Sequence, residues 1–348
     1  MLAVVYHGPD DLRLENVPKP TIGPSDILIK VSSASICGTD LRIWHGNHSK
    51  FPMGTIRIPG HEIVGKIAQI GSNVHGYSKD QSVFIAPNIG CGHCYQCVSG
   101  NNNRCTIQSN AIGITLDGGF AEYVLVPASA VMQGNVIPIF PGLDAAEASL
   151  IEPFACVLRG QDVLKIQPGE SVLIMGAGPI GIMHIQLAIL RGAGRVIVSE
   201  PLEERADQAF EVGANRVVIP TKENLAKVIN EETKDKGADV VIVAAPAHAA
   251  QEEALQLAGM GGRINFFGGL PKDRSVINFD SNIVHYKELT VAATTACSTG
   301  DCIRAAGIIN SGSVKLTGLI SARYSLTDAI QAYKTAEDRK SLKVVLEP

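Results

Sequence analysis

One stretch of the chain, residues 171–205, limits the possible folds more than any other. A short apolar run, Ser171 to Met175, ends in the hexapeptide GAGPIG at 176–181, and a second apolar run spans Arg195 to Ser199. Between them, Ile180 to Leu190 is apolar on nearly every face, as expected of a helix buried against a sheet. The stretch therefore predicts a strand, a glycine turn, a crossover helix and a second strand.

The glycines of this turn have the spacing that a bound pyrophosphate requires. Gly176 allows a tight turn, Gly178 lets the backbone approach the phosphates, and Gly181 lets helix and strand pack closely. Glu200, about twenty residues further on, can accept hydrogen bonds from the adenosine ribose, and its charge repels a 2′-phosphate. The alternative is a glycine-rich turn without a ligand, but strand, helix, second strand and acid together favour a dinucleotide site. The acid itself favours NAD over NADP. The predicted cofactor-binding residues are Gly176, Gly178, Pro179, Ile180, Gly181, Glu200 and Arg205.

Length and charge limit the classes of protein to which the chain can belong. The chain has 348 residues, enough for roughly two domains, and 45% of them are hydrophobic. Its net charge of −4 and the absence of a basic run argue against nucleic-acid or membrane partners. No apolar stretch reaches the length of a spanning helix, and the N-terminus lacks the pattern of a secretion signal. We expect a cytoplasmic protein that acts on a small molecule.

The pattern of predicted elements changes twice along the chain. Residues 1–152 contain short strands broken by Gly and Pro, the last of them predicted at Gly119 to Val126, which is typical of a mostly β domain. Residues 153–293 alternate strands with helices and supply six strands, as a doubly wound sheet needs. Residues 294–348 mix helix and strand, and we assign them back to the first domain. The six predicted strands are Ser171 to Met175, Arg195 to Ser199, Arg216 to Ile219, Asp239 to Ala245, Arg263 to Phe267 and Leu289 to Ala293.

Four cysteines lie within fifteen positions, at Cys91, Cys94, Cys97 and Cys105. In a reducing compartment such a cluster indicates metal binding rather than disulfides. Four thiolates suit a closed, tetrahedral, structural zinc in a lobe of about residues 88–108, which leaves His93 at the surface. A [4Fe–4S] cluster and free thiols are the alternatives.

A second set of candidate ligands is spread along the chain. Cys37, His61 and Glu152 offer a thiolate, an imidazole and a carboxylate, which together make a three-ligand zinc site with an open position, the catalytic type. Each residue alone has a simpler interpretation, because a cysteine can be a small buried residue, a histidine a core residue and a glutamate a helix-start acid.

Taken together, these motifs resemble the zinc-dependent medium-chain alcohol dehydrogenase family over nearly the full length of the chain. The resemblance rests on CGTD at 37–40, GHEIVG at 60–65, the four-cysteine lobe, DGGFAEYV at 117–124 and GAGPIG at 176–181. Ile151-Glu152-Pro153-Phe154 is similar to the sorbitol (polyol) and threonine dehydrogenase branch. The family implies a GroES-like, mostly β catalytic domain beside a Rossmann domain with a six-stranded parallel sheet.

The resemblance also implies a reaction. Zinc is expected on Cys37, His61 and either Glu62 or Glu152, a choice that the sequence leaves open, and Thr39 matches the hydroxyl that takes the substrate proton. Hydride then passes to NAD from a secondary hydroxyl of a polyol or sugar derivative, giving a ketone. The alternatives are L-threonine 3-dehydrogenase, a simple alcohol dehydrogenase and, more remotely, a non-catalytic NAD(P) sensor.

Two positions depart from the pattern of the family. Arg42 stands where related enzymes often place a relay histidine, and arginine cannot carry a proton at neutral pH, so His45 and His48 become relay candidates unless both are exposed loop residues. Cys297 and Ser298 replace an Arg-Tyr pair that grips sorbitol, which argues against sorbitol itself.

Trp44 is either a pocket residue or a core residue, and Cys156, Cys297 and Cys302 are expected to pack. By resemblance, pairing of residues 289–293 between chains gives a homodimer or homotetramer.

Overall fold

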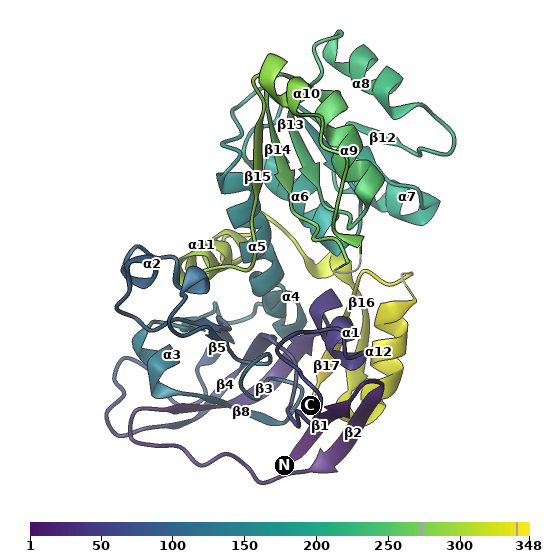
Figure 1. The fold of residues 1–348 in the computed structure, drawn as a ribbon. Helices are drawn as coiled ribbons and strands as arrows, with labels where there is room; N and C mark the ends of the chain where they lie inside the picture. The colour runs from purple at the N-terminus through teal and green to yellow at the C-terminus, as the bar shows by residue number, and fades with distance from the viewer. Residues whose placement is uncertain (272–273, 339) are drawn as a thin grey trace. The chain divides into compact units, whose positions relative to one another are not determined.

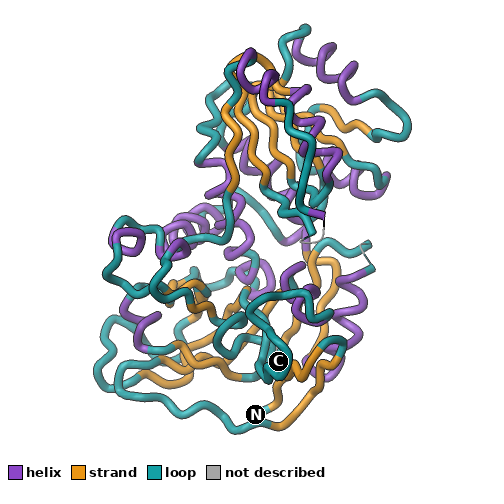
Figure 2. Tube along the Cα trace, in the orientation of Figure 1, coloured by secondary structure: helices purple, strands orange, loops and turns teal. Residues whose placement is uncertain are grey.

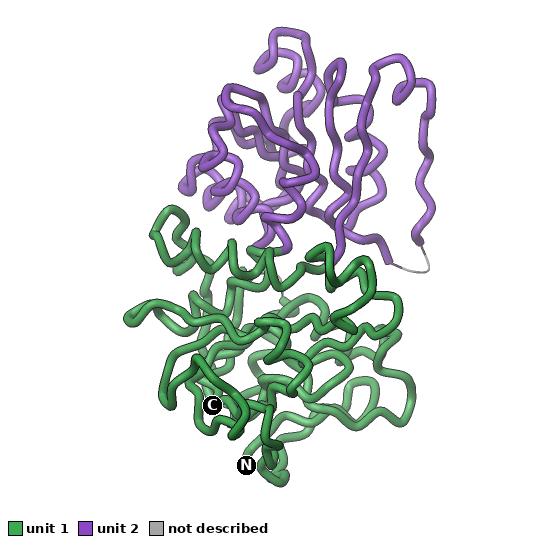
Figure 3. Tube along the Cα trace, turned by 90° about the vertical axis from the view of Figure 1, so that its left-hand side faces the viewer, with its two compact units in different colours: residues 1–155, 296–348 green, residues 156–295 purple. Residues whose placement is uncertain are grey.

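A computed structural model describes residues 1–271, 274–338 and 340–348, which form two compact units (Figure 1). Unit 1 contains Met1–Ala155 and Ala296–Pro348, and unit 2 contains Cys156–Thr295 (Figure 3). The boundaries predicted from the sequence are 152/153 and 293/294. No helix among the described residues is both long enough and apolar enough to cross a membrane.

Unit 2 is built on a six-stranded parallel sheet in the order β12-β11-β10-β13-β14-β15. The strands run side by side in the upper part of Figure 2. This order reverses at β10, the strand that precedes the glycine turn, as in a doubly wound nucleotide-binding fold. The predicted Rossmann fold is therefore confirmed. The strands are β10 (Ser171–Met175), β11 (Arg195–Ser199), β12 (Arg216–Val218), β13 (Ala238–Val243), β14 (Ala258–Phe266) and β15 (Thr290–Ala293).

The helices of unit 2 connect successive strands of this sheet. α6 packs on β10 and β11, and seven of its residues are buried, which explains why its apolar residues cover more than one face. The more amphipathic α7 packs on β11 and β12, and α9 packs on β13 and β14. The helices are α6 (Pro179–Leu190), α7 (Glu203–Glu211), α8 (Leu225–Thr233), α9 (His248–Leu257) and α10 (Ser281–Tyr286), and α5 (Ile151–Asp162) enters the unit from unit 1.

Unit 1 is built on a mostly antiparallel seven-stranded sheet in the order β16-β17-β3-β4-β5-β9, with β8 also paired to β3. The long strand β3 is buried at both ends, with the exposed Lys30 and the half-buried Ser32 in its middle, and its last residues lie beside the candidate metal ligands. Two small two-stranded sheets, β1-β2 and β6-β7, complete the strands. The strands are β1 (Leu2–Gly8), β2 (Asp11–Asn16), β3 (Ile27–Ser35), β4 (Glu62–Ile70), β5 (Ser82–Ile85), β6 (Asn88–Ile89), β7 (Asn110–Ala111), β8 (Tyr123–Val126), β9 (Val136–Pro138), β16 (Ile320–Ser325) and β17 (Lys343–Glu347).

An aromatic group anchors the core of unit 1. Tyr333 makes edge-to-face contacts with Trp44 and Phe120, at ring-centroid distances of 5.5 and 5.9 Å. Trp44 is 9% exposed and belongs to the core, which decides between its two interpretations. The helices of this unit are short: α1 (Gly38–Trp44), α2 (Tyr95–Val98), α3 (Ala128–Met132), α4 (Ala145–Ser149), α11 (Thr299–Asn310) and α12 (Ala329–Glu337), with 3₁₀ turns η1 (Asn102–Arg104), η3 (Thr317–Leu319) and η4 (Leu326–Asp328).

Candidate active site

The end of β3 and the start of β4 bring three candidate ligands together. These strands are antiparallel, and their register pairs Ser35 with Glu62, so that Cys37 lies near His61. The sulfur of Cys37, a ring nitrogen of His61 and a carboxylate oxygen of Glu62 all lie within 4.8 Å of one another. Gly60 precedes them with φ +97°, and a Cβ there would lie 2.7 Å from the Phe120 ring, so this turn requires glycine.

Asp40 lies next to this cluster and adds a negative charge to it. Its carboxylate accepts a hydrogen bond from the backbone N–H of Cys37 at 2.8 Å, which caps α1, and its other oxygen lies 3.5 Å from Nδ1 of His61. Burial alone lowers the pKa of His61, but Asp40 and Cys37 raise it well above its usual range. A site that raises the pKa of an imidazole in this way also attracts a metal cation.

The two oxygens of Glu62 face different surroundings. Oε2 accepts hydrogen bonds from Ser35 and, at 2.5 Å, from Nζ of Lys343. Oε1 is buried and has no hydrogen-bond partner among the described residues. A buried carboxylate oxygen without a donor, placed near a thiol and an imidazole, is the chemistry of a zinc ligand. The residues present therefore fit a catalytic zinc.

Glu152, the other candidate acid, lies outside this cluster. It begins α5, and its Oε1 accepts a contact from the thiol of Cys297 at 3.6 Å. The sulfur of Cys297 also lies 3.5 Å from that of Cys302, and both cysteines are buried, as expected of packing residues. The structure thus brings Glu62, rather than Glu152, together with Cys37 and His61.

The region around Thr39 contains the relay candidates. Arg42 donates a hydrogen bond from Nη2 to Oγ1 of Thr39 at 2.9 Å. His45 is held at both ring nitrogens, by Asp10 at 2.6 Å and by Glu337 at 2.7 Å. Burial alone lowers the pKa of His45, but these two carboxylates outweigh it and raise the pKa. His45 is therefore a paired, charged residue.

His48 has the opposite character. Burial lowers its pKa, and the nearby positive charges of Arg42 and His61 lower it further. Its Nδ1 accepts a hydrogen bond from the backbone N–H of Lys50 at 3.2 Å, which leaves the ring proton on Nε2 in the neutral form. A neutral imidazole close to His61 and Arg42 is available to exchange a proton.

The four lobe cysteines form a separate cluster. Their sulfurs lie within 4.8 Å of one another, with Cys91–Cys97, Cys94–Cys97 and Cys94–Cys105 distances of 4.0, 3.5 and 3.8 Å. Zinc–sulfur bonds of about 2.3 Å in a tetrahedron require sulfurs about 3.8 Å apart. None of the eight cysteines, all of which the structure describes, forms a disulfide. The lobe therefore fits a structural zinc.

Backbone N–H groups also prepare this cluster for a metal. Cys91 and Gln108 each donate from the backbone to the sulfur of Cys105 at 3.3 Å. Burial alone raises the pKa of Cys105, but these donors and Ile107 lower it to about 6. A thiolate that accepts several N–H groups is ready to bind zinc. His93 is exposed, as predicted.

In unit 2, the glycine turn has the geometry that a dinucleotide needs. Gly176 has φ +105°, and a Cβ on Gly181 would lie 1.9 Å from the carbonyl oxygen of Gly176. Gly178 caps the start of α6, and Pro179 occupies its first turn, where no N–H is needed. The backbone can therefore approach a phosphate at this turn without a side chain in the way.

The predicted ribose-binding acid lies directly against this turn. Glu200 is 4% exposed, and it accepts hydrogen bonds from the backbone N–H of Ala177 at 2.7 Å and of Leu202 at 3.0 Å. Arg205 reaches the same place, because a Cβ on Gly178 would lie 3.6 Å from its Nη1. The structure thus gathers the predicted cofactor-binding residues at the end of β10, and they fit a dinucleotide.

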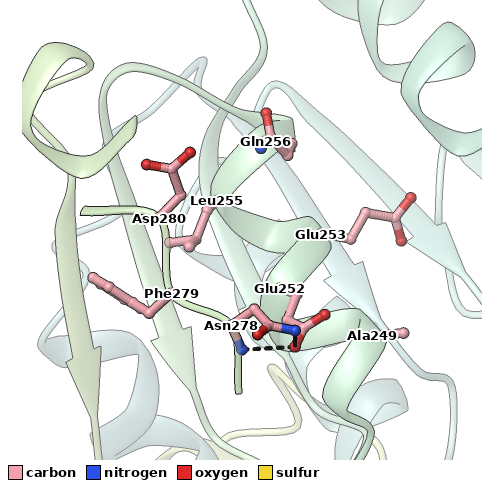
Figure 4. A pocket seen from close by; sticks show the side chains of 8 residues that line it. All are labelled: Ala249, Glu252, Glu253, Leu255, Gln256, Asn278, Phe279 and Asp280. Carbon is pink, nitrogen blue, oxygen red and sulfur yellow. Dashed lines mark hydrogen bonds between the residues drawn. The ribbon is translucent and has the colours of Figure 1, made fainter. Parts of the chain in front are cut away.

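A further hollow of about 660 Å³ in unit 2 lies between α9 and the segment before α10 (Figure 4). Two of its three acids already serve the fold. Glu252 accepts hydrogen bonds from the backbone and side chain of Asn278, and Asp280 caps α10 by accepting from Asn282 and Ile283. We assign no function to it.

A chain that contains both a Rossmann sheet with a dinucleotide turn and a GroES-like unit with a cysteine–histidine–glutamate cluster is an NAD(P)- and zinc-dependent dehydrogenase. Comparison with known families agrees: residues 23–138 match the alcohol dehydrogenase GroES-like domain and residues 179–311 match the zinc-binding dehydrogenase domain. The chain belongs to the zinc-dependent medium-chain alcohol dehydrogenase family.

Individual relatives extend over the whole chain. L-threonine 3-dehydrogenase of Pyrococcus furiosus is 34% identical and covers 99% of this chain and 98% of its own length. The same enzyme of Yersinia enterocolitica is 33% identical over 97% and 96%. A zinc-binding dehydrogenase structure from Sinorhizobium meliloti, bound to NADP, has a TM-score of 0.92, 34% identity and coverage of 100% and 99%. Galactitol-1-phosphate dehydrogenase of Escherichia coli has a TM-score of 0.90 with 24% identity and coverage of 100% of both chains, which shows a shared fold.

Sequence reasoning missed three residues of this site. Ser35 and Lys343 bind Glu62, and Asp40 supports His61. Asp40 stands within the CGTD motif, which could have signalled its role. Lys343 lies about 300 residues from Cys37 in an ordinary strand sequence, and only the pairing of β17 with β3 brings it to the site.

Proposed function

We propose that this enzyme oxidises a secondary hydroxyl to a ketone at a zinc held by Cys37, His61 and Glu62. The single observation that carries the proposal is the cluster of these three ligand atoms, with one oxygen of Glu62 unsatisfied among the described residues. When bound, zinc supplies Lewis acidity that lowers the pKa of a substrate hydroxyl, and NAD supplies the hydride acceptor.

The residues of the chain supply positioning and proton transfer. Thr39 takes the proton of the substrate hydroxyl, and its oxygen is held by the N–H donor of Arg42. Because that oxygen already accepts a hydrogen bond from Arg42, the Thr39 proton points elsewhere and can be passed on. His48, whose lowered pKa keeps its ring neutral, can accept a proton at Nδ1 once the 3.2 Å hydrogen bond from the backbone N–H of Lys50 opens, and it then releases the proton of Nε2 to water.

Two classes of substrate fit the site, and the position of Arg42 decides which class we place first. None of the ion pairs found within residues 1–271, 274–338 and 340–348 involves Arg42, and its exposed guanidinium lies next to Thr39. A cation there suits a substrate with a carboxylate or a phosphate. L-threonine, the substrate named for the relatives, therefore comes first, and an acidic sugar derivative precedes a neutral polyol or cyclitol.

We further propose NAD as the preferred cofactor, because Glu200 places a buried carboxylate at the turn and would repel a 2′-phosphate. The neighbour from Sinorhizobium meliloti is bound to NADP, so this preference belongs to the residues of this chain. A cytoplasmic location is proposed as well, because the four-cysteine lobe requires reduced thiols.

A substrate panel tests the proposal. Zinc-loaded protein is mixed with NAD or NADP and with L-threonine, sugar acids, sugar phosphates, neutral polyols, cyclitols and simple alcohols, while NADH or NADPH absorbance is followed. We expect turnover with L-threonine or an acidic sugar derivative, and an Arg42→Gln variant with a raised KM for that substrate only. No turnover across the panel, in protein that holds zinc and binds NAD, would favour a non-catalytic sensor.

A further inference from the structure

The last strand of the chain places a lysine inside the candidate metal site. Lys343 of β17 is 5% exposed, and its ammonium donates hydrogen bonds to Oε2 of Glu62 at 2.5 Å and to the backbone carbonyl of Ile36 at 3.1 Å. Lysine is almost never buried unless it is paired. The ammonium is thus fixed between a candidate ligand and the residue that precedes Cys37.

This contact divides the two oxygens of Glu62 between two tasks. Oε2 is saturated, since it accepts from both Lys343 and Ser35. Oε1 has no hydrogen-bond partner among the residues that the structure describes, and it is the oxygen left for the ligand cluster with Cys37 and His61. A carboxylate held by donors on one oxygen can turn only with loss of those hydrogen bonds.

The charges of the site also need the lysine. Asp40 and Glu62 are fully buried, and a zinc-binding Cys37 is a thiolate. Three negative groups against one ammonium leave two negative charges, which a divalent cation neutralises.

We propose that Lys343 is a positioning residue of the catalytic zinc site: it keeps Oε2 of Glu62 occupied, so that Oε1 is presented to the metal beside Cys37 and His61. The inference rests on the proposed function, because it assumes that Glu62 is a zinc ligand. It goes beyond that function in assigning the retention of the catalytic zinc to a residue that does not touch the metal.

Zinc retention tests the proposal. Zinc-loaded wild type, Lys343→Met, Lys343→Arg and the exposed-lysine control Lys66→Met are dialysed against a graded chelator, and the zinc left per chain is measured. Loss of a residue that orients a ligand typically weakens metal binding about 10–100-fold. We expect Lys343→Met to lose one zinc at a chelator concentration lower by that factor, Lys343→Arg to recover much of the retention, and Lys66→Met to match wild type. The four-cysteine zinc, retained in every variant, is the internal control.

If Lys343→Met does not fold, a second pair of variants still tests the proposal. In a Glu62→Gln background, where the carboxylate is already absent, adding Lys343→Met should change zinc retention by less than twofold. An equal loss in both backgrounds would show that the lysine does not act through Glu62.

The cobalt spectrum gives a readout that a merely structural role would not move. In cobalt-substituted protein, Lys343→Met should alter the visible absorption of the catalytic metal, and Lys343→Arg should restore it. Wild-type retention and an unchanged cobalt spectrum in Lys343→Met would overturn the inference while leaving the proposed function intact. Failure of the wild type on the substrate panel is a separate result and would count against the proposed function alone.

Discussion

At the residue scale, Glu200 shows how one side chain can serve the fold and the cofactor. Its carboxylate accepts hydrogen bonds from Ala177 and Leu202, so it is held at the glycine turn before any ribose arrives. Preorganisation of this kind makes the acid both a hydrogen-bond acceptor and a fixed negative charge. The same charge that favours two ribose hydroxyls opposes a phosphate.

Glu200→Ala should relax the preference for NAD. A hydrogen bond to a charged group contributes about 1.5–3 kcal/mol, so the ratio of kcat/KM for NAD over NADP should fall roughly tenfold or more. Steady-state kinetics with both cofactors measures the ratio, and Glu203→Ala, a nearby exposed acid in α7, serves as the control. An unchanged ratio in Glu200→Ala would refute the ribose assignment.

His48 and His45 differ in a way that kinetics can separate. His48 has a lowered pKa, whereas both nitrogens of His45 are bound to carboxylates. His48→Gln should therefore slow hydroxyl oxidation at neutral pH, by up to about 10²-fold, and a higher pH should restore part of the rate. His45→Gln should leave kcat unchanged. Equal effects of the two substitutions would remove His48 from the relay.

The raised pKa of His45 also predicts a pH-dependent stability. A group with a raised folded-state pKa contributes stability below its unfolded pKa of about 6.5, and that contribution is lost as the pH rises through the folded-state value. His45→Gln should lower the free energy of unfolding at pH 6 and change it little at pH 9. Denaturant unfolding at both values measures the difference, and an equal loss at both would contradict the ion pairs.

At the element scale, β15 is the strand of unit 2 most exposed to association. It pairs with β14 on one side and forms an end of the six-strand order, with Thr290 and Ala293 exposed. A sheet edge presents unpaired N–H and C=O groups to another chain. We propose that β15 pairs with its counterpart in a second copy, which gives a homodimer or a tetramer built from dimers.

Lysines on this edge test the proposed association. A double variant, Thr290→Lys with Ala293→Lys, should shift the protein toward monomer, because charged edge residues oppose strand pairing. Sedimentation velocity reports the mass, and Met260→Lys, at a site 72% exposed, is the control for added charge. A wild-type monomer, or a double variant with an unchanged assembly, would contradict the edge as an interface.

At the scale of the whole molecule, local sequence predicted the architecture well. The glycine turn, its flanking apolar runs and the βα alternation are encoded by neighbouring residues, and the six-stranded parallel sheet is confirmed. The order of its strands follows from the right-handed connections that such units adopt. The strand predicted to begin at Gly119 starts only at Tyr123, because residues before it run as bends against the turn of Gly60.

The candidate metal site could be predicted only in part, because its members come from distant segments. Cys37 and His61 stand in recognisable motifs, but the choice between Glu62 and Glu152 depends on which carboxylate the sheet register brings to them. Lys343 carries no motif at all. Long-range strand pairing decides such contacts, and no local pattern contains it.

Zinc content per chain tests whether the molecule holds two metals with different tasks. We predict two zincs per chain in wild type and one in Cys37→Ser, which should be inactive with an unchanged melting temperature. Cys97→Ser should also hold fewer zincs per chain, but it should melt at a lower temperature. Two zincs in Cys37→Ser, or only one in fully loaded wild type, would contradict the assignment of one catalytic and one structural zinc site.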